Sequence, residues 1–377
     1  MGNFIEYIYV GNIAACIILG IVLLFAKTTP HPHNQHYLIA KKFIAFSLFL
    51  AAIAVIMDLL IGDVNDSKVE MLNIITLIDF NIQIVIFTFA LMTLYHSQLV
   101  SRKNIYTFLT PLIVLIVAYL IALIIYGDIC VFSHDQYLAT ITQEPALIIR
   151  TLMFIWGIIS VIICIRLFLK AQQKFNTAID NYFDGTKELH TRWVGYIFYT
   201  SLILAGLVAI SYIIILPYFD ALSTVGITVL FTVISIHFLN YPQTFKVIYP
   251  ALETSQEITI SAAQINTIEN KLQNWKTLAT KPYTQEGITL NKLADDINEN
   301  KRAISKYLNT TCNTNFNTWI NTLRIEDAMR LFKKNELPLY QIAELTGFSD
   351  LSKMSNFMKK HTGLTPSEYR KKYYNKA

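Results

Sequence analysis

Two short groups of residues near the carboxyl end combine cationic side chains with hydroxyl and amide groups. The first group is Lys301, Arg302, Ser305 and Lys306, and the second is Ser352, Lys353, Asn356 and Lys360. The members of each group recur at helical spacing, which places them along one face of a helix. Cationic groups attract phosphates, whereas amides and hydroxyls form hydrogen bonds with base edges. We therefore predict that these two faces contact DNA.

The second group lies in a sharply defined helix-turn-helix pattern. A short amphipathic helix is predicted before Gly347, which supplies a left-handed turn residue. Ser349 or Asp350 can cap the next helix, which is predicted to run from Leu351 to His361. The residues of that helix predicted to point inward are Met354, Phe357, Met358 and His361.

The first group lies in a similar pattern. A helix that contains Leu290 and Ile297 is followed by a turn at Asn298 to Asn300 and by a second helix from Lys301 to Thr310. A helix from Phe316 to Lys333, apolar on one side, connects the two units. After the second unit, the residues from Thr365 to Glu368 predict a capping box that begins a final helix.

These residues resemble the AraC/XylS-type DNA-binding domain of bacterial transcription regulators. The resemblance covers roughly Ile265 to Tyr373 and rests on Leu293-Ala294, Arg324 to Ala328, Ile342-Ala343, Gly347 to Asp350 and Gly363 to Arg370. The family usually has phenylalanine where Met354 and Met358 stand, and an apolar residue where Glu299 stands. The resemblance implies that the second helix of each unit enters a major groove. It also implies that the expected partners are double-stranded promoter DNA, a second copy of the chain on that DNA, and RNA polymerase.

Charge is distributed in agreement with DNA binding. From residue 265 onward there are 18 Lys and Arg against 11 Asp and Glu, a net charge of +7. The whole chain carries +5, so residues 1 to 264 sum to −2. The basic excess therefore lies in the predicted DNA-binding part, where it can neutralise phosphates. On charge alone, a merely solvated surface is an equal alternative.

The amino-terminal part of the chain has the composition of a membrane protein. The chain is 54% hydrophobic and only 15% charged, with a mean hydropathy of +0.42. Seven apolar stretches are each long enough to cross a hydrocarbon core of about 30 Å. They run Tyr7 to Ala26, Phe43 to Ile61, Leu72 to Leu94, Ile105 to Tyr126, Ala146 to Leu169, Trp193 to Leu216 and Leu222 to Leu239. The sequence thus predicts an all-α protein, with a seven-helix membrane domain followed by a helical domain.

Basic residues in the connections predict the orientation of the spans. The connections after the first, third and fifth spans hold Lys27, Lys41, Lys42, Arg102, Lys103, Lys170, Lys174, Lys187 and Arg192. Those after the second, fourth and sixth spans hold only Lys68. The positive-inside rule places the former in the cytoplasm. The amino terminus is then outside a bacterial cytoplasmic membrane, and seven crossings put the carboxyl-terminal domain in the cytoplasm, where DNA is.

Several polar residues fall inside the predicted spans. Asp79 and Arg150 lie in the outer half of the membrane, where a charge usually faces the bundle interior and is paired. We predict that they pair and help to form an outward-facing ligand pocket for a small-molecule or lipid signal. The pocket comprises Asp58, Asp79, Gln83, Arg150, Tyr119 and Tyr212, with Asn81 nearby. The alternative is that these groups only snorkel or hold helices together.

The predicted domains are 1–240 for the membrane part, 241–263 for a linker and 264–377 for the DNA-binding part. Pro242 and Pro250 are expected to break the seventh helix, which would prevent it from acting as a rigid rod. No cofactor and no metal site are predicted. The histidines His31, His33 and His36 are explained by a polar, proline-containing loop.

The prediction for function is a membrane-integrated one-component transcription regulator that binds DNA in response to a signal sensed by the bundle. No nucleophile with its base and no paired acids mark an enzyme site, so an enzyme is not predicted. The alternatives are a membrane transporter or enzyme with an attached DNA-binding domain, and a passively anchored regulator without a ligand.

Overall fold

A computed structural model describes residues 2–28, 35–61, 70–95, 100–183, 192–211, 217–254, 258–333 and 337–374. Within these ranges the chain forms α-helices, one 3-10 turn and no strand, which confirms the all-α prediction. The residues divide into two compact units. The first consists of 1–173 and 191–246, and the second of 174–190 and 247–377. The second unit therefore combines the carboxyl-terminal domain with the last residues of two long helices of the amino-terminal part.

Seven helices of the described residues are long and apolar enough to cross a membrane, as the sequence predicted. They are α1 (Gly2–Phe25), α2 (Gln35–Ile61), α3 (Ile74–Leu94), α4 (Arg102–Tyr126), α6 (Pro145–Asp180), α7 (Arg192–Ser211) and α8 (Pro217–Thr254). Their outward residues are large and apolar, as lipid-facing surfaces require; Phe25 is 77% exposed and Ile124 83% exposed. Among the predicted spans, the sixth ended at Leu216, which lies outside the described residues.

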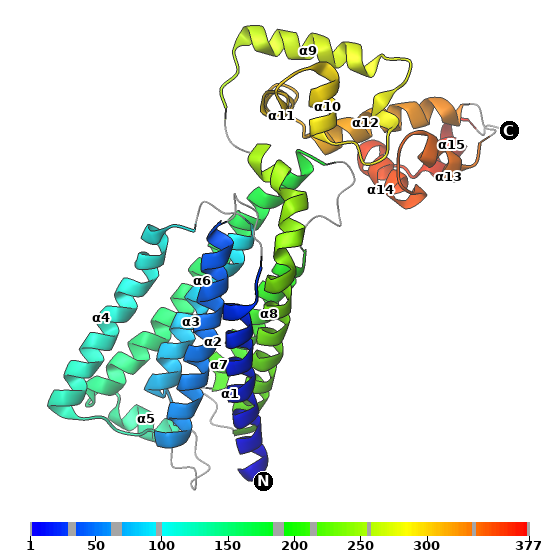
Figure 1. Cartoon of the computed structure of the whole chain (residues 1–377). Helices are drawn as coiled ribbons and strands as arrows, with labels where there is room; N and C mark the ends of the chain where they lie inside the picture. The colour runs from blue at the N-terminus through cyan, green and yellow to red at the C-terminus, as the bar shows by residue number, and fades with distance from the viewer. Residues whose placement is uncertain are drawn as a thin grey trace. The chain divides into compact units, whose positions relative to one another are not determined.

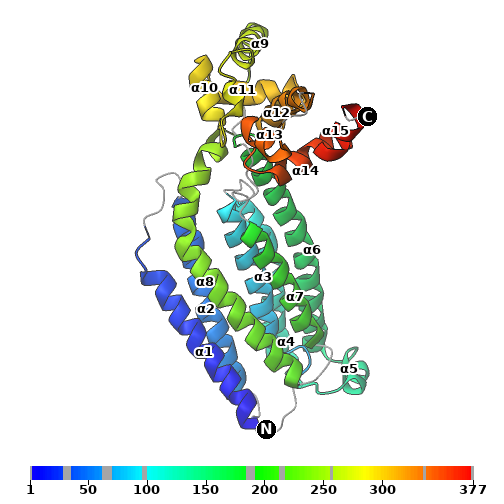
Figure 2. The same cartoon turned by 90° about the vertical axis from the view of Figure 1, so that its right-hand side faces the viewer.

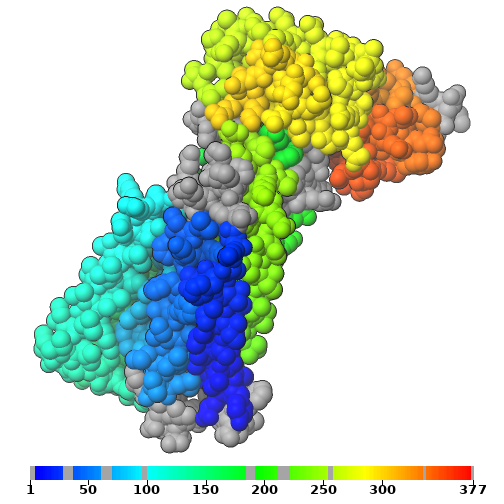
Figure 3. Space-filling model, viewed as in Figure 1, coloured from blue at the N-terminus to red at the C-terminus, as the bar shows by residue number. Residues whose placement is uncertain are grey.

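The bundle helices lie alongside one another in both ribbon views (Figures 1 and 2). Figure 3 shows α1 and α2 side by side on one face of this unit. A short helix that the sequence did not predict, α5 (His134–Thr140), follows α4 and begins at the cap residue Ser133. It lies at the same end of the bundle as the amino terminus (Figures 1 and 2). This agrees with the predicted topology, in which the amino terminus and the connection between the fourth and fifth spans share a side.

Helix α8 runs through both prolines, so the expected break in the seventh helix is wrong. Pro242 has no N–H to donate to the carbonyl of Phe238, four residues earlier. That carbonyl instead accepts a hydrogen bond of 2.5 Å from the hydroxyl of Tyr37 on α2. Tyr241 and Phe245 on either side are fully or almost fully buried. Packing and a substitute donor therefore keep the helix continuous, as neighbouring helices commonly do in membrane proteins.

The carboxyl-terminal domain is built from short helices around a 3-10 turn. They are α9 (Ala262–Lys276), η1 (Pro282–Thr284), α10 (Leu290–Ile297), α11 (Lys301–Thr310), α12 (Phe316–Phe332), α13 (Leu339–Leu345), α14 (Leu351–Thr362) and α15 (Pro366–Tyr373). Helix α9 buries Ile268, Leu272 and Trp275, and Trp275 stacks on Trp319 of α12 at 5.9 Å. Between Thr254 of α8 and Ala262 of α9 there are seven residues, 255 to 261. The boundaries 241–263 and 264–377 stay predictions.

Candidate DNA-binding surface

The turn before α14 is shaped by a glycine that no other residue can replace without strain. Gly347 has φ +87, and a Cβ atom built on it would lie 2.3 Å from the backbone oxygen of Thr284. Phe348 then enters the core, where Arg324 lies 5.7 Å from the centroid of its ring. The chain thus turns sharply enough for α14 to begin at Leu351.

Asp350, one of the two predicted caps, holds the first turn of α14. Its Oδ1 atom accepts a hydrogen bond of 2.7 Å from the backbone N–H of Lys353. Its Oδ2 atom accepts one of 3.0 Å from the hydroxyl of Ser349. The first of these bonds is the main reason that the pKa of Asp350 lies below its ordinary value. Both predicted cap residues therefore take part, Asp350 directly and Ser349 through it.

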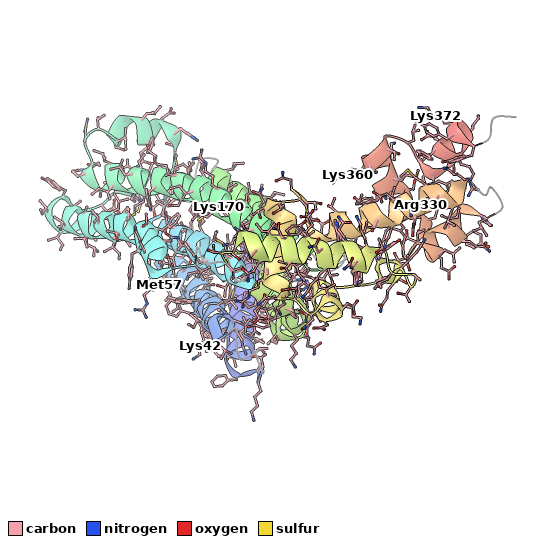
Figure 4. The ribbon with its side chains drawn as sticks, turned by 90° about the horizontal axis from the view of Figure 1, so that it is seen from above. Lys42, Met57, Lys170, Arg330, Lys360 and Lys372 are labelled. Atoms are coloured by element: carbon pink, nitrogen blue, oxygen red, sulfur yellow. The ribbon has the colours of Figure 1, made fainter. Side chains whose placement is uncertain are left out.

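The outer face of α14 presents most of the predicted group. Ser352, Asn356 and Lys360 are exposed and Lys353 is half-buried, while Met354 and Met358 are fully buried. Figure 4 marks Lys360 on this helix. His361, which was expected to point inward, is exposed, so that part of the prediction is wrong. Helix α14 ends at Thr362, one residue after His361, and the left-handed Gly363 caps it.

Helix α11 begins with the predicted turn and is capped by Asn300. The Oδ1 atom of Asn300 accepts a hydrogen bond of 2.8 Å from the backbone N–H of Arg302. Asn298 ends the preceding helix with φ +48, a conformation that asparagine tolerates. The two helices of the first unit therefore have the predicted bounds, and Glu299 does not disturb the turn because its carboxylate pairs with Lys271 at 2.9 Å.

The predicted contact face of α11 is less open than that of α14. Lys301, Arg302 and Lys306 are half-buried. Ser305 is only 7% exposed, so the prediction that it faces outward is wrong. The side-chain amide of Asn309, one turn later, donates hydrogen bonds to the backbone oxygen of Ser305 at 2.8 Å and to the hydroxyl of Ser305 at 3.3 Å. Lys301 and Arg302 pair with Glu253 of α8, which belongs to the same compact unit.

Buried polar residues of α12 fix η1, a feature that the apolar pattern of this helix did not reveal. Arg324 is 1% exposed, and its guanidinium donates to the backbone oxygens of Tyr283 and Gln285 at 2.7 and 2.8 Å. Asp327 accepts from the Tyr283 hydroxyl at 2.7 Å and from Lys281 at 2.8 Å. Burial raises the pKa of the Tyr283 hydroxyl, and the carboxylate of Asp327 raises it further. Since Gly347 packs against η1, these contacts also support the turn before α14.

The final helix α15 begins with the predicted capping box. Thr365 and Glu368 exchange hydrogen bonds between side chain and backbone. The bonds that Glu368 accepts from the backbone and side chain of Thr365 hold the pKa of its carboxyl below the ordinary value. Lys371 and Lys372 follow in the same helix, and Figure 4 marks Lys372. Cationic groups therefore continue beyond α14 on this part of the domain.

In the bundle, the structure gives Arg150 different partners from those predicted. Arg150 is fully buried, and its guanidinium donates to Glu70 at 2.6 Å and to the backbone oxygen of Ile129 at 2.6 Å. It also lies 3.3 Å from a carboxylate oxygen of Asp128. Glu70 precedes α3 and Asp128 follows α4, so both lie in connections, where a pattern of apolar spans does not reveal them.

Two other predicted pocket residues join this network. The hydroxyl of Tyr119 donates to Asp128 at 2.5 Å. The amide of Asn73 donates to Glu70 at 3.1 Å and approaches Asp58 at 3.4 Å. We call the set the Arg150 network. It comprises Asp58, Glu70, Asn73, Tyr119, Asp128 and Arg150.

The predicted pair of Asp79 with Arg150 is wrong: in the part of the chain that the structure describes, the two form no ion pair. Asp79 instead accepts a hydrogen bond of 3.1 Å from Gln83, one turn along α3. Gln83 also donates to the backbone oxygen of Ser47 on α2 at 2.9 Å. Arg150 pairs instead with Glu70 and Asp128, which lie in the connections before α3 and after α4. Tyr212 lies outside the described residues.

The bundle is hollowed at a different place from the predicted pocket. An open groove of about 510 Å³ lies between α4 and α6, with an almost wholly apolar lining. Its lining residues are Thr110, Pro111, Val114, Leu115, Leu152, Ile155, Trp156 and Ile159. Metal-binding groups of three or more His, Cys, Asp or Glu are absent from the described residues, and His31 and His33 lie outside them.

Comparison with known proteins agrees with the carboxyl-terminal geometry. A family model described as a helix-turn-helix domain, of the AraC type, matches residues 293–372. The match spans α11 to α14 completely, together with most of α10 and α15. No curated protein and no solved structure matches the chain.

Proposed function

We propose that this chain is a membrane-integrated transcription regulator. The premise is that residues 293–372 form an AraC-type helix-turn-helix domain, and that seven candidate membrane spans precede it in the same chain. Its second helices α11 and α14 read DNA in successive major grooves, and its bundle senses a signal that controls this binding. The observation that carries the proposal is the occurrence of both parts in one chain.

The contact residues that we propose are on α11 and α14. On α14, Ser352 and Asn356 reach base edges, whereas Lys353 and Lys360 neutralise phosphates. On α11, Lys301, Arg302 and Lys306 neutralise phosphates. Ser305 is left out of this set because it is buried. A homodimer on promoter DNA and contact with RNA polymerase are parts of the proposal that rest on the resemblance to the family.

The orientation we propose follows from the basic residues of the connections. Lys and Arg gather in the connections after the first, third and fifth spans, which the positive-inside rule assigns to the cytoplasm. An odd number of spans then leaves the amino terminus outside and the DNA-binding domain inside. Addition of a cysteine-reactive, membrane-impermeant label to intact cells tests this orientation. Cys130, which is exposed in the connection after α4, should be labelled, whereas Cys312 in the carboxyl-terminal domain should not.

The Arg150 network is the proposed place of signal action. It ties the beginnings and ends of α2, α3, α4 and α6 together at one end of the bundle. A signal can shift the bundle only if it binds two arrangements of these helices unequally. A ligand that replaces Glu70 or Asp128 at the buried guanidinium of Arg150, or that replaces Arg150 at these carboxylates, would bind the two arrangements unequally.

The DNA-binding part of the proposal is tested by Asn356→Ala in the full chain. Loss of an amide that reads a base should lower the affinity for the preferred sequence by about 1 to 3 kcal/mol and relax selectivity at one position. Asn270→Ala, which removes an exposed amide from α9, is the matched control. The measurement is selection of duplex DNA from a random library by each variant in lipid nanodiscs. Equal selectivity of the two variants would show that α14 does not read bases.

The sensing part is tested by sequencing DNA crosslinked to the chain in its native membrane. Arg150→Gln should change promoter occupancy or transcription at matched protein levels. If occupied promoters are found and neither quantity changes, the bundle acts as a passive anchor. If no discrete promoter is found for the wild-type chain, the proposed DNA-binding function fails.

A further inference from the structure

The last turn of α8 places a carboxylate on the predicted DNA-contact residues of α11. Oε2 of Glu253 lies 3.0 Å from Nζ of Lys301, and Oε1 lies 3.6 Å from an Nη atom of Arg302. The three side chains are all partly shielded from water, with exposures of 35% for Glu253, 24% for Lys301 and 29% for Arg302. Both oxygens of one carboxylate therefore face two adjacent cations.

These two cations stand in the first turn of α11, directly after the cap residue Asn300. An anion at this place is favoured by the cations and by the positive end of the helix dipole. A DNA phosphate beside a reading helix would be bound by the same groups. The carboxylate of Glu253 thus occupies a position whose chemistry suits a phosphate.

The segment that follows α6 also contacts the first helix-turn-helix unit. The segment after α6 reaches the beginning of α10, where the backbone N–H of Leu290 donates to the oxygen of Tyr182 at 2.9 Å. Phe183 and Thr289 form an isolated antiparallel bridge. The ends of α6 and α8 therefore both contact the first helix-turn-helix unit, within one compact unit of the protein.

The two reading faces differ accordingly. On α14, Ser352, Asn356 and Lys360 are exposed to solvent. On α11, the cations Lys301 and Arg302 are half-buried and paired with Glu253. The second helix-turn-helix unit is thus open to DNA, whereas in the first unit the phosphate-binding groups Lys301 and Arg302 are already paired with Glu253.

We propose that the end of α8 is an internal competitor of DNA, in which Glu253 substitutes for a phosphate on Lys301 and Arg302. The first unit binds DNA fully only after Glu253 has left these cations. This inference rests on the proposed function, since it requires α11 to contact DNA. It assigns to the last residues of the seventh span the role of transmitting the state of the bundle to the reading helix.

The test is the affinity of the full chain, in lipid nanodiscs, for duplex DNA selected from a random library. Glu253→Gln keeps the size of the side chain and removes its charge. It should tighten binding about three- to tenfold, as expected for the loss of two partly exposed ion pairs. The slope of log affinity against log salt should become steeper by about one to two, because two cations become free for phosphates.

Glu326→Gln is the matched control, because it makes the same change of charge at an exposed position on α12. A second control places Glu253→Gln in a chain that also carries Lys301→Met and Arg302→Met, where its effect should vanish. The inference is overturned if Glu253→Gln binds like the wild type, or if Glu326→Gln gains as much. If neither the wild type nor Glu253→Gln selects any sequence, the proposed DNA-binding function itself fails. If Glu253→Gln selects a DNA sequence and the wild type does not, the result supports the proposal that Glu253 competes with DNA.

Discussion

Replacement of Gly347 by alanine should unfold the second helix-turn-helix unit more than any comparable change in the domain. With φ +87, the residue lies in the left-handed region, where an added Cβ costs about 1 to 2 kcal/mol. The new Cβ would also lie 2.3, 2.6 and 2.8 Å from the oxygen, carbonyl carbon and Cα of Thr284. These are backbone atoms, so no side-chain rotation can relieve the contact.

The clash adds to the conformational cost. Forcing an extra methyl group into a packed site typically costs about 1 to 3 kcal/mol. The sum predicts that Gly347→Ala lowers the free energy of unfolding by roughly 2 to 5 kcal/mol. The displaced backbone belongs to η1, whose oxygen at Tyr283 is bound by Arg324, so the damage should spread to α12.

Gly363 provides the matched control within the same unit. It has φ +77, yet a Cβ atom built there would meet nothing within 4 Å. Gly363→Ala should therefore cost only the conformational part, about 1 to 2 kcal/mol. Urea titration of the full chain in detergent, followed by tryptophan fluorescence, compares the two, because Trp275 and Trp319 stack in this domain. Equal losses for the two variants would refute the role of the Thr284 contact.

Two further outcomes follow from the site contacts. Asp350→Ala should destabilise the second helix-turn-helix unit by about 1 kcal/mol through loss of the cap. Because the pKa of Asp350 is lowered in the folded chain, the greater stability of the wild type should be complete above pH 3.8 and should fade as the pH falls below it. Urea titrations of both chains at several pH values would check this. Arg150→Gln should lower the thermal stability of the bundle by the equivalent of about 3 kcal/mol, because Glu70 and Asp128 lose their buried partner. An unchanged melting temperature would mean that water compensates the two carboxylates.

Local patterns in the sequence were sufficient to predict the helices of the DNA-binding part. The bounds of α10 and α11 agree with the predictions, and α14 ends one residue later, at Thr362. Apolar spacing, caps and glycines act within a few residues of where they stand, so a single sequence contains them. The seven spans were predictable for the same reason, since length and hydropathy are local properties.

Long-range partners could not be predicted in this way. Arg150 and Glu70 are 80 residues apart, and several carboxylates were available in the sequence for the same arginine. The position of Arg150 inside a predicted span indicates that this arginine needs a partner, but it does not indicate which carboxylate the partner is. Likewise, the pairing of Glu253 with Lys301 depends on tertiary contacts that no periodic pattern encodes.

The break expected in α8 was wrong for a related reason. The rule that proline interrupts a helix considers only the lost N–H and the clash within the helix. Tyr37, about two hundred residues earlier, supplies a donor to the carbonyl that Pro242 leaves free. A hydroxyl on a neighbouring helix thus changed the outcome of a local rule.

The short connection between α8 and α9 limits where transcription can be controlled. Seven residues, 255 to 261, reach at most about 25 Å when fully extended. In a membrane-inserted chain the DNA-binding domain therefore stays within a thin layer beside the bilayer and cannot diffuse through the cell. If the chain acts as proposed, motion of the chromosome would have to carry each promoter to the membrane. How often a gene is regulated would then depend on its position in the folded chromosome as well as on the number of regulator molecules.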